Sequence, residues 1–286
     1  MKIDQDQQRR QIEKFIRRMP SLSTTVGKVL EICSRTDASP NELNRVISLD
    51  PVLTGQVLKL INSAYYSLVA KVTSLTRAIT MLGMNTVKNM ALSTAIIKSV
   101  SSAKKSKVLP TSKFWAHSIG VGACAKLLAV AGDVPVMERE EYFVAGLLHD
   151  IGKVPFGDEY SEVLGVAKRE QAPLVEVEQE LMGINHQEVG LMIAEKWKLN
   201  PVIQQCVSAH HNVDQADDPF QRLIATVALA DIYSNIFDFG YAGNLFPAER
   251  GIEQLLVVSG LGWDEYAGVR DGVETQIEKA QIFLQV

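Results

Sequence analysis

Short amphipathic segments fill the first hundred residues, and most of them follow a residue that can cap a helix. Apolar positions recur at helical spacing, and no stretch alternates as a half-buried strand would. Residues 39–42 carry a complete signal for the start of a helix. Ser39 is the cap, a proline occupies the first helical position and Glu42 the third. The predicted helices cover residues 7–18, 25–35, 40–50, 51–63, 75–82 and 85–100. Asp50, Ser74 and Asn85 are the predicted caps of the last three.

Longer apolar runs occupy the second half of the chain and predict buried helices. Prolines and glycines within residues 155–183 indicate that part of this stretch is a loop, which could cover a site. Residues 238–247 are rich in glycine and aromatic residues and predict a connection. The predicted helices include residues 114–119, 142–148, 186–194, 202–209 and 224–233, followed by 249–258 and 263–283.

These patterns predict an all-α fold, a multi-helix bundle with an N-terminal helical subdomain. Residues 101–112 are polar and rich in serine and lysine, so we expect a hinge or loop there and place the subdomain boundary in it. The expected division is an N-terminal helical part at residues 1–112, a helical core at residues 113–237 and a C-terminal helical extension at residues 238–286.

The composition is that of a globular protein. Of 286 residues, 47% are hydrophobic and 22% are charged, which is enough for a sizeable core. No apolar run approaches about 20 residues, so no transmembrane helix is expected, and the first six residues are too polar for a secretory signal. The three cysteines are widely spaced in apolar contexts, which is typical of reduced core residues. We therefore expect a cytoplasmic protein.

Charge divides the chain into a basic and an acidic half. Residues 1–113 hold 18 Lys and Arg against 7 Asp and Glu, a net charge of +11, and the remainder holds 11 against 26, a net charge of −15. One interpretation is internal complementarity, with bound cations offsetting part of the negative charge. Another is a basic surface for an acidic protein or an anionic ligand. Nucleic acid is not expected, because no recognition motif accompanies the charge.

The stretch from His149 to Lys153 directly follows the apolar run that ends at Leu148. Burying a histidine beside an aspartate is costly unless the groups are paired or bind a metal. An imidazole and a carboxylate suit Fe, Mn, Zn or Ni. Adjacent helical residues point about 100° apart, so His149 and Asp150 could serve two neighbouring ions. Lys153 can reach the side of Asp150 and hold an anion there.

The other histidines and one aspartate lie on successive predicted helices. A single helical histidine such as His117 or His186 is usually a core or surface residue. His210 and His211 could simply favour a helix C-terminus, and Asp231 could be an interhelical hydrogen-bond acceptor. Their joint clustering is nevertheless what a metal site in a helix bundle requires. The predicted ligands are His117, His149, Asp150, His186, His210, His211 and Asp231.

This order of residues resembles the metal-binding order of the HD phosphohydrolase superfamily, and the HDIGK and HH motifs are similar to those of its HD-GYP branch. Two further stretches, VISLDPVLTGQVLKLINSAYYS and SLTRAITMLGMNTVKNMALS, resemble the HD-related output domain (HDOD) family of bacterial signalling proteins over residues 18–235. The resemblance implies an HD-like core for residues 113–237 and one or two divalent transition-metal ions. It also implies catalytic roles for Asp150 and Lys153 if the chain is an enzyme.

Two positions depart from the HD-GYP pattern. Asn212 follows the histidine pair where that branch has a glutamate, and no GYP follows. Lys113 stands one turn before His117, where a three-metal site has a glutamate. Acidic residues in the loop at 213–219 would also repel a doubly anionic dinucleotide. We therefore expect no cyclic di-GMP hydrolysis.

Two functions of different class follow from these motifs. The first is a signal-transduction output module that keeps its metal site and acts through a protein partner. The second is a metal-dependent phosphohydrolase or phosphodiesterase, in which Lys153 would hold a non-bridging phosphate oxygen. Because a fold does not decide function, the first is preferred on the family resemblance and the missing substrate-selecting motif.

Overall fold

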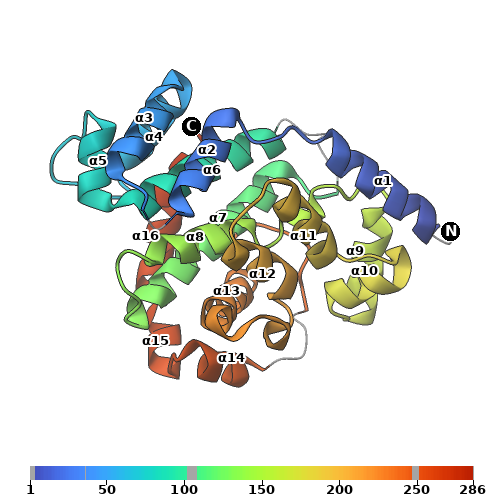
Figure 1. Ribbon diagram of the computed structural model, residues 1–286. Helices are drawn as coiled ribbons and strands as arrows, with labels where there is room; N and C mark the ends of the chain where they lie inside the picture. Colours follow the sequence, from blue (N-terminus) through green and yellow to red (C-terminus); the bar gives the residue numbers. More distant parts are fainter. Residues whose placement is uncertain (1–3, 36, 102–107, 247–250, 286) are drawn as a thin grey trace.

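A computed structural model describes residues 4–285 except residues 36, 102–107 and 247–250 (Figure 1). This part of the chain forms sixteen α-helices and three short 3-10 helices and no strand, which confirms the all-α fold class. The α-helices are α1 (Gln5–Arg18), α2 (Thr24–Cys33), α3 (Pro40–Ser48), α4 (Pro51–Ile61), α5 (Leu75–Leu82), α6 (Met84–Ser101), α7 (Thr111–Ala131), α8 (Arg139–Leu148), α9 (Tyr160–Glu170), α10 (Leu174–Met182), α11 (His186–Lys196), α12 (Pro201–Ala209), α13 (Asp218–Ile236), α14 (Ile252–Ser259), α15 (Trp263–Gly268) and α16 (Arg270–Ala280). The 3-10 helices are η1 (Ile151–Lys153), η2 (Val213–Gln215) and η3 (Gln281–Leu284).

Three predicted helix caps are present. The side chains of Ser39, Asp50 and Ser74 accept hydrogen bonds from backbone N–H groups three residues later, at 3.2, 3.0 and 3.3 Å. Each cap satisfies one N–H that a helix start would otherwise leave without a partner. The N-terminal helices therefore begin where short polar side chains precede apolar runs.

Three details differ from the sequence-based expectation. Asn85 caps no helix, because α6 already begins at Met84. The Glu42 carboxylate does not close a capping box but accepts a hydrogen bond of 2.7 Å from Arg35, whose guanidinium offers a stronger, charged partner. The helix predicted over 263–283 is divided into α15 and α16 around Val269. Part of the predicted hinge, residues 102–107, and residues 249–250 of a predicted helix lie outside the described residues.

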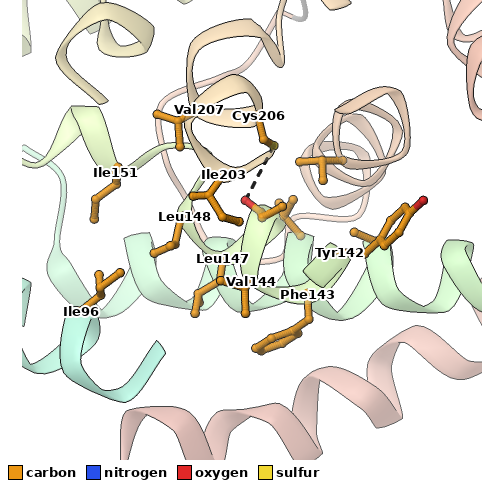
Figure 2. Close-up of a cluster of buried hydrophobic side chains, with 14 of the residues drawn as sticks. Ile96, Tyr142, Phe143, Val144, Leu147, Leu148, Ile151, Ile203, Cys206 and Val207 are labelled. Atoms are coloured by element: carbon orange, nitrogen blue, oxygen red, sulfur yellow. Dashed lines mark hydrogen bonds between the residues drawn. The ribbon is translucent and has the colours of Figure 1, made fainter. Parts of the chain in front are cut away.

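Helix α7 is the centre of the core, where it packs against α8, α13 and α16. It is long and apolar enough to cross a membrane by length and composition, contrary to the expectation that no such run exists, yet 72% of its most apolar window is buried inside the protein. Such burial is typical of the core helix of a globular domain. Figure 2 shows the neighbouring apolar cluster, in which Leu148 at the end of α8 lies between Ile203 of α12 and Ile96 of α6.

Glycines let α7 and α8 approach closely. A Cβ on Gly146 of α8 would lie 2.8 Å from the Cα of Gly122 on α7, and a Cβ on Gly122 would lie 2.7 Å from the carbonyl oxygen of Phe143. Only a residue without a side chain fits such a contact. The close approach matters for function because α7 carries His117 and α8 ends directly before His149.

Candidate metal centre

Seven polar residues from five regions of the helical core meet at one place. Six of them are buried and the seventh, His211, is partly buried. Histidine and aspartate side chains are rarely buried in such number unless they are paired with one another or bind a metal. The residues are His117 in α7, His149 and Asp150 after α8, His186 at the first position of α11, His210 and His211 after α12, and Asp231 within α13.

Local structure explains why His149, Asp150 and His186 face one another. The chain leaves α8 at His149 and turns at once into η1, so the two adjacent side chains point in different directions. A Cβ on Gly152 would clash with the carbonyl group of His186 and the N–H of Gly190, so η1 lies directly on the start of α11. Asn185 and Glu188 form a capping box that fixes this start.

The Asp150 carboxylate lies between two groups of histidines. Its Oδ2 is 3.4 Å from Nε2 of His149 and 3.9 Å from Nε2 of His117. Its Oδ1 is 3.4 Å from Nε2 of His186 and 3.6 Å from Nε2 of His210. Candidate ligand atoms lie within 4.8 Å of one another in each of two groups, one of His117, His149 and Asp150 and one of Asp150, His186, His210 and His211.

Asp231 adds a second carboxylate to the first group. Its Oδ1 lies 3.0 Å from Nε2 of His117 and 3.6 Å from Nε2 of His149. Side-chain amides hold this carboxylate in place: Asn235 donates to Oδ1 at 2.9 Å and Asn244 donates to Oδ2 at 3.3 Å. The structure thus brings together all seven residues singled out in the sequence.

Three of the imidazoles are oriented through their second nitrogen. Nδ1 of His149 lies 2.7 Å from the carbonyl oxygen of Gly146, Nδ1 of His186 lies 2.6 Å from Oε2 of Glu178, and Nδ1 of His210 lies 3.1 Å from the carbonyl oxygen of Cys206. Because a carbonyl oxygen or an ionised carboxylate can only accept, each Nδ1 facing one carries the proton and donates it. This is the usual outer support of a metal-binding histidine, and in the neutral imidazole it leaves the lone pair of Nε2 for a metal ion.

The Nε2 atoms of the second group then face one another. Nε2 of His186 lies 3.3 Å from Nε2 of His210 and 3.0 Å from Nε2 of His211. Nε2 of His117, Nε2 of His149 and Oδ1 of Asp150 are buried and have no hydrogen-bond partner among the described residues. Unpartnered acceptors gathered in a buried space are costly, whereas a cation satisfies all of them at once. The residues present therefore fit a divalent metal ion in each group.

The charges of the centre support neutral imidazoles in the second group. Burial, together with the positive charge of Lys153, holds the pKa of His186 well below its usual value, and burial lowers the pKa of His211. Burial acts to raise the pKa of Asp150, but His149 and Lys153 hold it well below its usual range. His149 differs: burial favours its neutral form, but Asp150 and Asp231 raise its pKa to about 10. In the metal-free protein a proton on His149 thus stands where a cation would bind.

Lys153 is buried, and its ammonium lies 2.6 Å from Oδ2 of Asp150, as its position three residues later predicts. Its charge is therefore already directed at the carboxylate shared by the two groups. An ammonium in this position can also attract an anion to the centre.

Several residues around the centre were missed by the sequence reading. Tyr160 of α9 donates a short hydrogen bond to Glu178 of α10, and Glu178 also accepts from the backbone N–H of His186 at 2.8 Å. Residues 155–183 were expected to be partly loop, and α9 and α10 fill much of this stretch as a helical hairpin. Glu178 lies on the apolar face of the helix LVEVEQELM, and this unusual position could have indicated its role from the sequence.

Comparisons with known proteins identify the family of the chain. The HDOD domain model matches residues 19–213. A solved HDOD domain protein of unknown function from Geobacter sulfurreducens has a TM-score of 0.78 and 25% identity, covering 99% of this chain and 100% of that one. An uncharacterised protein of Treponema pallidum is 25% identical over 77% of this chain and 43% of its own length.

A ribonuclease Y of Lachnoclostridium phytofermentans is 33% identical over 40% of this chain and 16% of its own length. The chain thus spans less than half of the length of the curated relatives it matches. The family model, in contrast, covers most of the chain, from helix α2 to the loop after the histidine pair. The chain belongs to the HDOD domain family.

Proposed function

We propose that the chain is a bacterial signalling output module of the HDOD type whose core holds two divalent transition-metal ions. The position of Asp150 carries this proposal, because its two oxygens face two separate sets of imidazole nitrogens. Neutral imidazoles combined with carboxylates suit Fe, Mn, Zn or Ni. One ion would be held by His117, His149, Asp150 and Asp231, and the other by Asp150, His186, His210 and His211.

The enclosure of the centre favours a module that acts through a protein partner. Only His211 among the seven candidate ligands is more than slightly exposed. Ions held between α7, α8, α11, α12 and α13 would tie these helices together, and their binding energy would add to the stability of the fold. A rigid core of this kind suits the presentation of a surface to a signalling protein in the cytoplasm.

A second candidate, metal-dependent hydrolysis of a phosphoester, is favoured by the complete ligand set and by Lys153. Two such ions supply an activated water and neutralise the charge of a phosphate. Asp150 would position both ions. The ammonium of Lys153, 2.6 Å from Oδ2 of Asp150, would hold a non-bridging phosphate oxygen. The likeness to a ribonuclease over part of the chain supports this candidate.

Metal content tests the proposed centre. The purified protein should contain about two transition-metal ions per chain by elemental analysis. Asp150→Ala should remove most of the metal, because it takes a ligand from both groups, whereas His117→Ala should leave about one ion. Asp158→Ala, at an exposed aspartate after η1, is the matched control. Unchanged metal content in Asp150→Ala would refute the centre.

Turnover separates the two candidate functions. We expect no cyclic di-GMP hydrolysis above background with added Mn²⁺ or Fe²⁺, because Asn212 and Lys113 stand where HD-GYP-like enzymes have glutamates. A generic phosphodiester such as bis(4-nitrophenyl) phosphate tests for hydrolysis without that substrate preference. Turnover that requires metal and disappears in Asp150→Ala would give the hydrolase first place.

A further inference from the structure

A second feature, a cavity of about 690 Å³, lies between the N-terminal helices and the core. It is bordered by α2, by α6 and by the connection from α11 to α12, and it contains none of the seven candidate metal ligands. Figure 1 shows α2 and α6 beside the helices of the core. Cavities of about 300–1,000 Å³ commonly bind small molecules. This one has walls of leucine, tryptophan and proline side chains, with lysines among them.

A buried lysine of α6 lines this cavity. Lys88 is only 9% exposed, and its neighbour Asn89 is 4% exposed. The described residues provide neither side chain with a hydrogen bond or an ion pair. A positive charge on a largely buried side chain that lacks an ion-pair partner favours the binding of an anion. The effect of its charge is visible on Cys33, another residue of the wall, whose pKa is raised by burial and lowered by Lys88.

The surroundings of Lys88 are positive as well. Lys28 of α2 and Lys198 before α12 also line the cavity, and Glu31 is the one acidic residue of its wall, so the lining carries a net charge of +2. The N-termini of α2 and α12 contribute Ser23, Thr24, Asn200 and Pro201 to the wall. Helix N-termini add partial positive charge, which favours an anion.

We propose that this cavity binds a small phosphorylated molecule, with its phosphate at Lys88 and its apolar part against leucines of the wall. A dianionic phosphate matches the net charge of +2, and lysine binds phosphate as a compact point charge. The apolar walls, which include Leu22, Leu92 and Leu199, favour a phosphate ester over the free ion. A small molecule can enter the cavity and reach the end of a lysine that is only 9% exposed, whereas the surface of an acidic protein cannot.

Calorimetric titration of the full chain with phenyl phosphate, adenosine monophosphate, inorganic phosphate and phenol tests this proposal. A phosphate ester should bind more tightly than inorganic phosphate or phenol. Lys88→Met should weaken its binding by about tenfold or more, as expected for the loss of one charge-assisted contact. Lys98→Met, at an exposed lysine of the same helix, should bind as the unmodified chain does.

Asp150→Ala should retain phosphate-ester binding, because the cavity and the metal centre share no residue. Loss of binding in Asp150→Ala but not in Lys88→Met would place the phosphate at the metal centre and overturn the proposal. Failure of both esters to bind at millimolar concentration would overturn it too. These outcomes are independent of the metal content of the protein.

Thermal unfolding distinguishes a ligand-binding lysine from one that only stabilises the fold. Without ligand, Lys88→Met should unfold at a higher temperature than the unmodified chain, because an unpaired buried charge has been replaced by an apolar side chain of similar length. Phenyl phosphate should then raise the midpoint of the unmodified chain but not that of the variant. A lower midpoint for the ligand-free variant would show that Lys88 stabilises the fold and would contradict the proposal.

Discussion

Among single residues, Glu178 supports one candidate metal ligand, His186, without being a ligand itself. Its Oε2 accepts hydrogen bonds from Nδ1 of His186 at 2.6 Å and from the backbone N–H of the same residue. Burial raises the pKa of Glu178 to about 7, although Lys153 and the hydrogen bond from Tyr160 act to lower it. The carboxylate therefore fixes the direction and raises the basicity of one candidate ligand.

Glu178→Gln should weaken metal binding by about 10- to 100-fold, the usual effect of losing such outer support. The substitution keeps the size of the side chain but removes the charge that supports His186. Competition with a chelator of known affinity measures the change. Glu176→Gln, on the exposed side of the same helix, is the control. Equal affinity in both variants would mean that Glu178 has no part in metal binding.

The candidate ligands could be predicted from the sequence, whereas most of the residues that support them could not. His149 and Asp150 stand out because two polar residues directly follow a buried apolar run, and the remaining histidines fall into a known order. Asn235 and Asn244 lie on polar or mixed segments, where such residues need no explanation, and Glu178 differs from its polar neighbours only in lying on the apolar face of α10. Their role depends on which helices pack together, and hydrophobic periodicity does not contain that information.

At the scale of elements, the contact between η1 and the start of α11 holds the centre together. Gly152 has no room for a Cβ because the carbonyl group of His186 and the N–H of Gly190 occupy the space. Neither obstacle is a flexible side chain, so both pieces of backbone would have to move. The separation of Asp150 from His186 depends directly on this contact.

Gly152→Ala should lower the free energy of unfolding by about 1–3 kcal/mol, as overpacking typically does, and it should also reduce metal content. Gly165→Ala in α9 is a matched control, because a Cβ there meets no atom within 4 Å. That variant should be unchanged or more stable by up to about 1 kcal/mol, since alanine favours a helix interior. Chemical denaturation measures both. Equal stability of the two variants would contradict the close contact at Gly152.

Helix positions were largely predictable, and the exceptions have local causes. Ser39, Asp50 and Ser74 cap helices as expected because their side chains satisfy backbone groups nearby in sequence. Asn85 does not, since α6 begins one residue earlier. The pairing of Glu42 with Arg35 is a competition between two partners that propensity alone does not decide.

At the scale of the molecule, the N-terminal helices and the core share one apolar interior, which extends from Ile12 to Phe283. Lys196 of α11 links them: its ammonium donates to the carbonyl oxygens of Met19 at 2.8 Å and of Ile16 at the end of α1. A cation at a helix C-terminus adds charge-assisted hydrogen bonds to the last carbonyl groups and interacts favourably with the negative end of the helix.

Lys196→Met should therefore lower the free energy of unfolding by about 1–3 kcal/mol, the usual effect of leaving buried acceptors without their charged donor. Lys168→Met, at an exposed lysine of α9, should change it little. Unfolding followed by fluorescence and by circular dichroism should remain one transition in both variants, because the core is shared. Separate transitions would indicate that the two halves fold independently.

The hydrogen-bonded series from Tyr160 through Glu178 to His186 has one more consequence, which concerns the exchange of backbone amides with solvent. Because α9 and α10 hold His186 in place, an ion bound by His186 must in turn hold the hairpin closed. This coupling is reciprocal. Removal of metal by a chelator should speed deuterium uptake in residues 160–182 more than in α14. By the same thermodynamic cycle, any molecule that binds the hairpin from outside and keeps it closed would raise the affinity of the candidate centre for a metal ion.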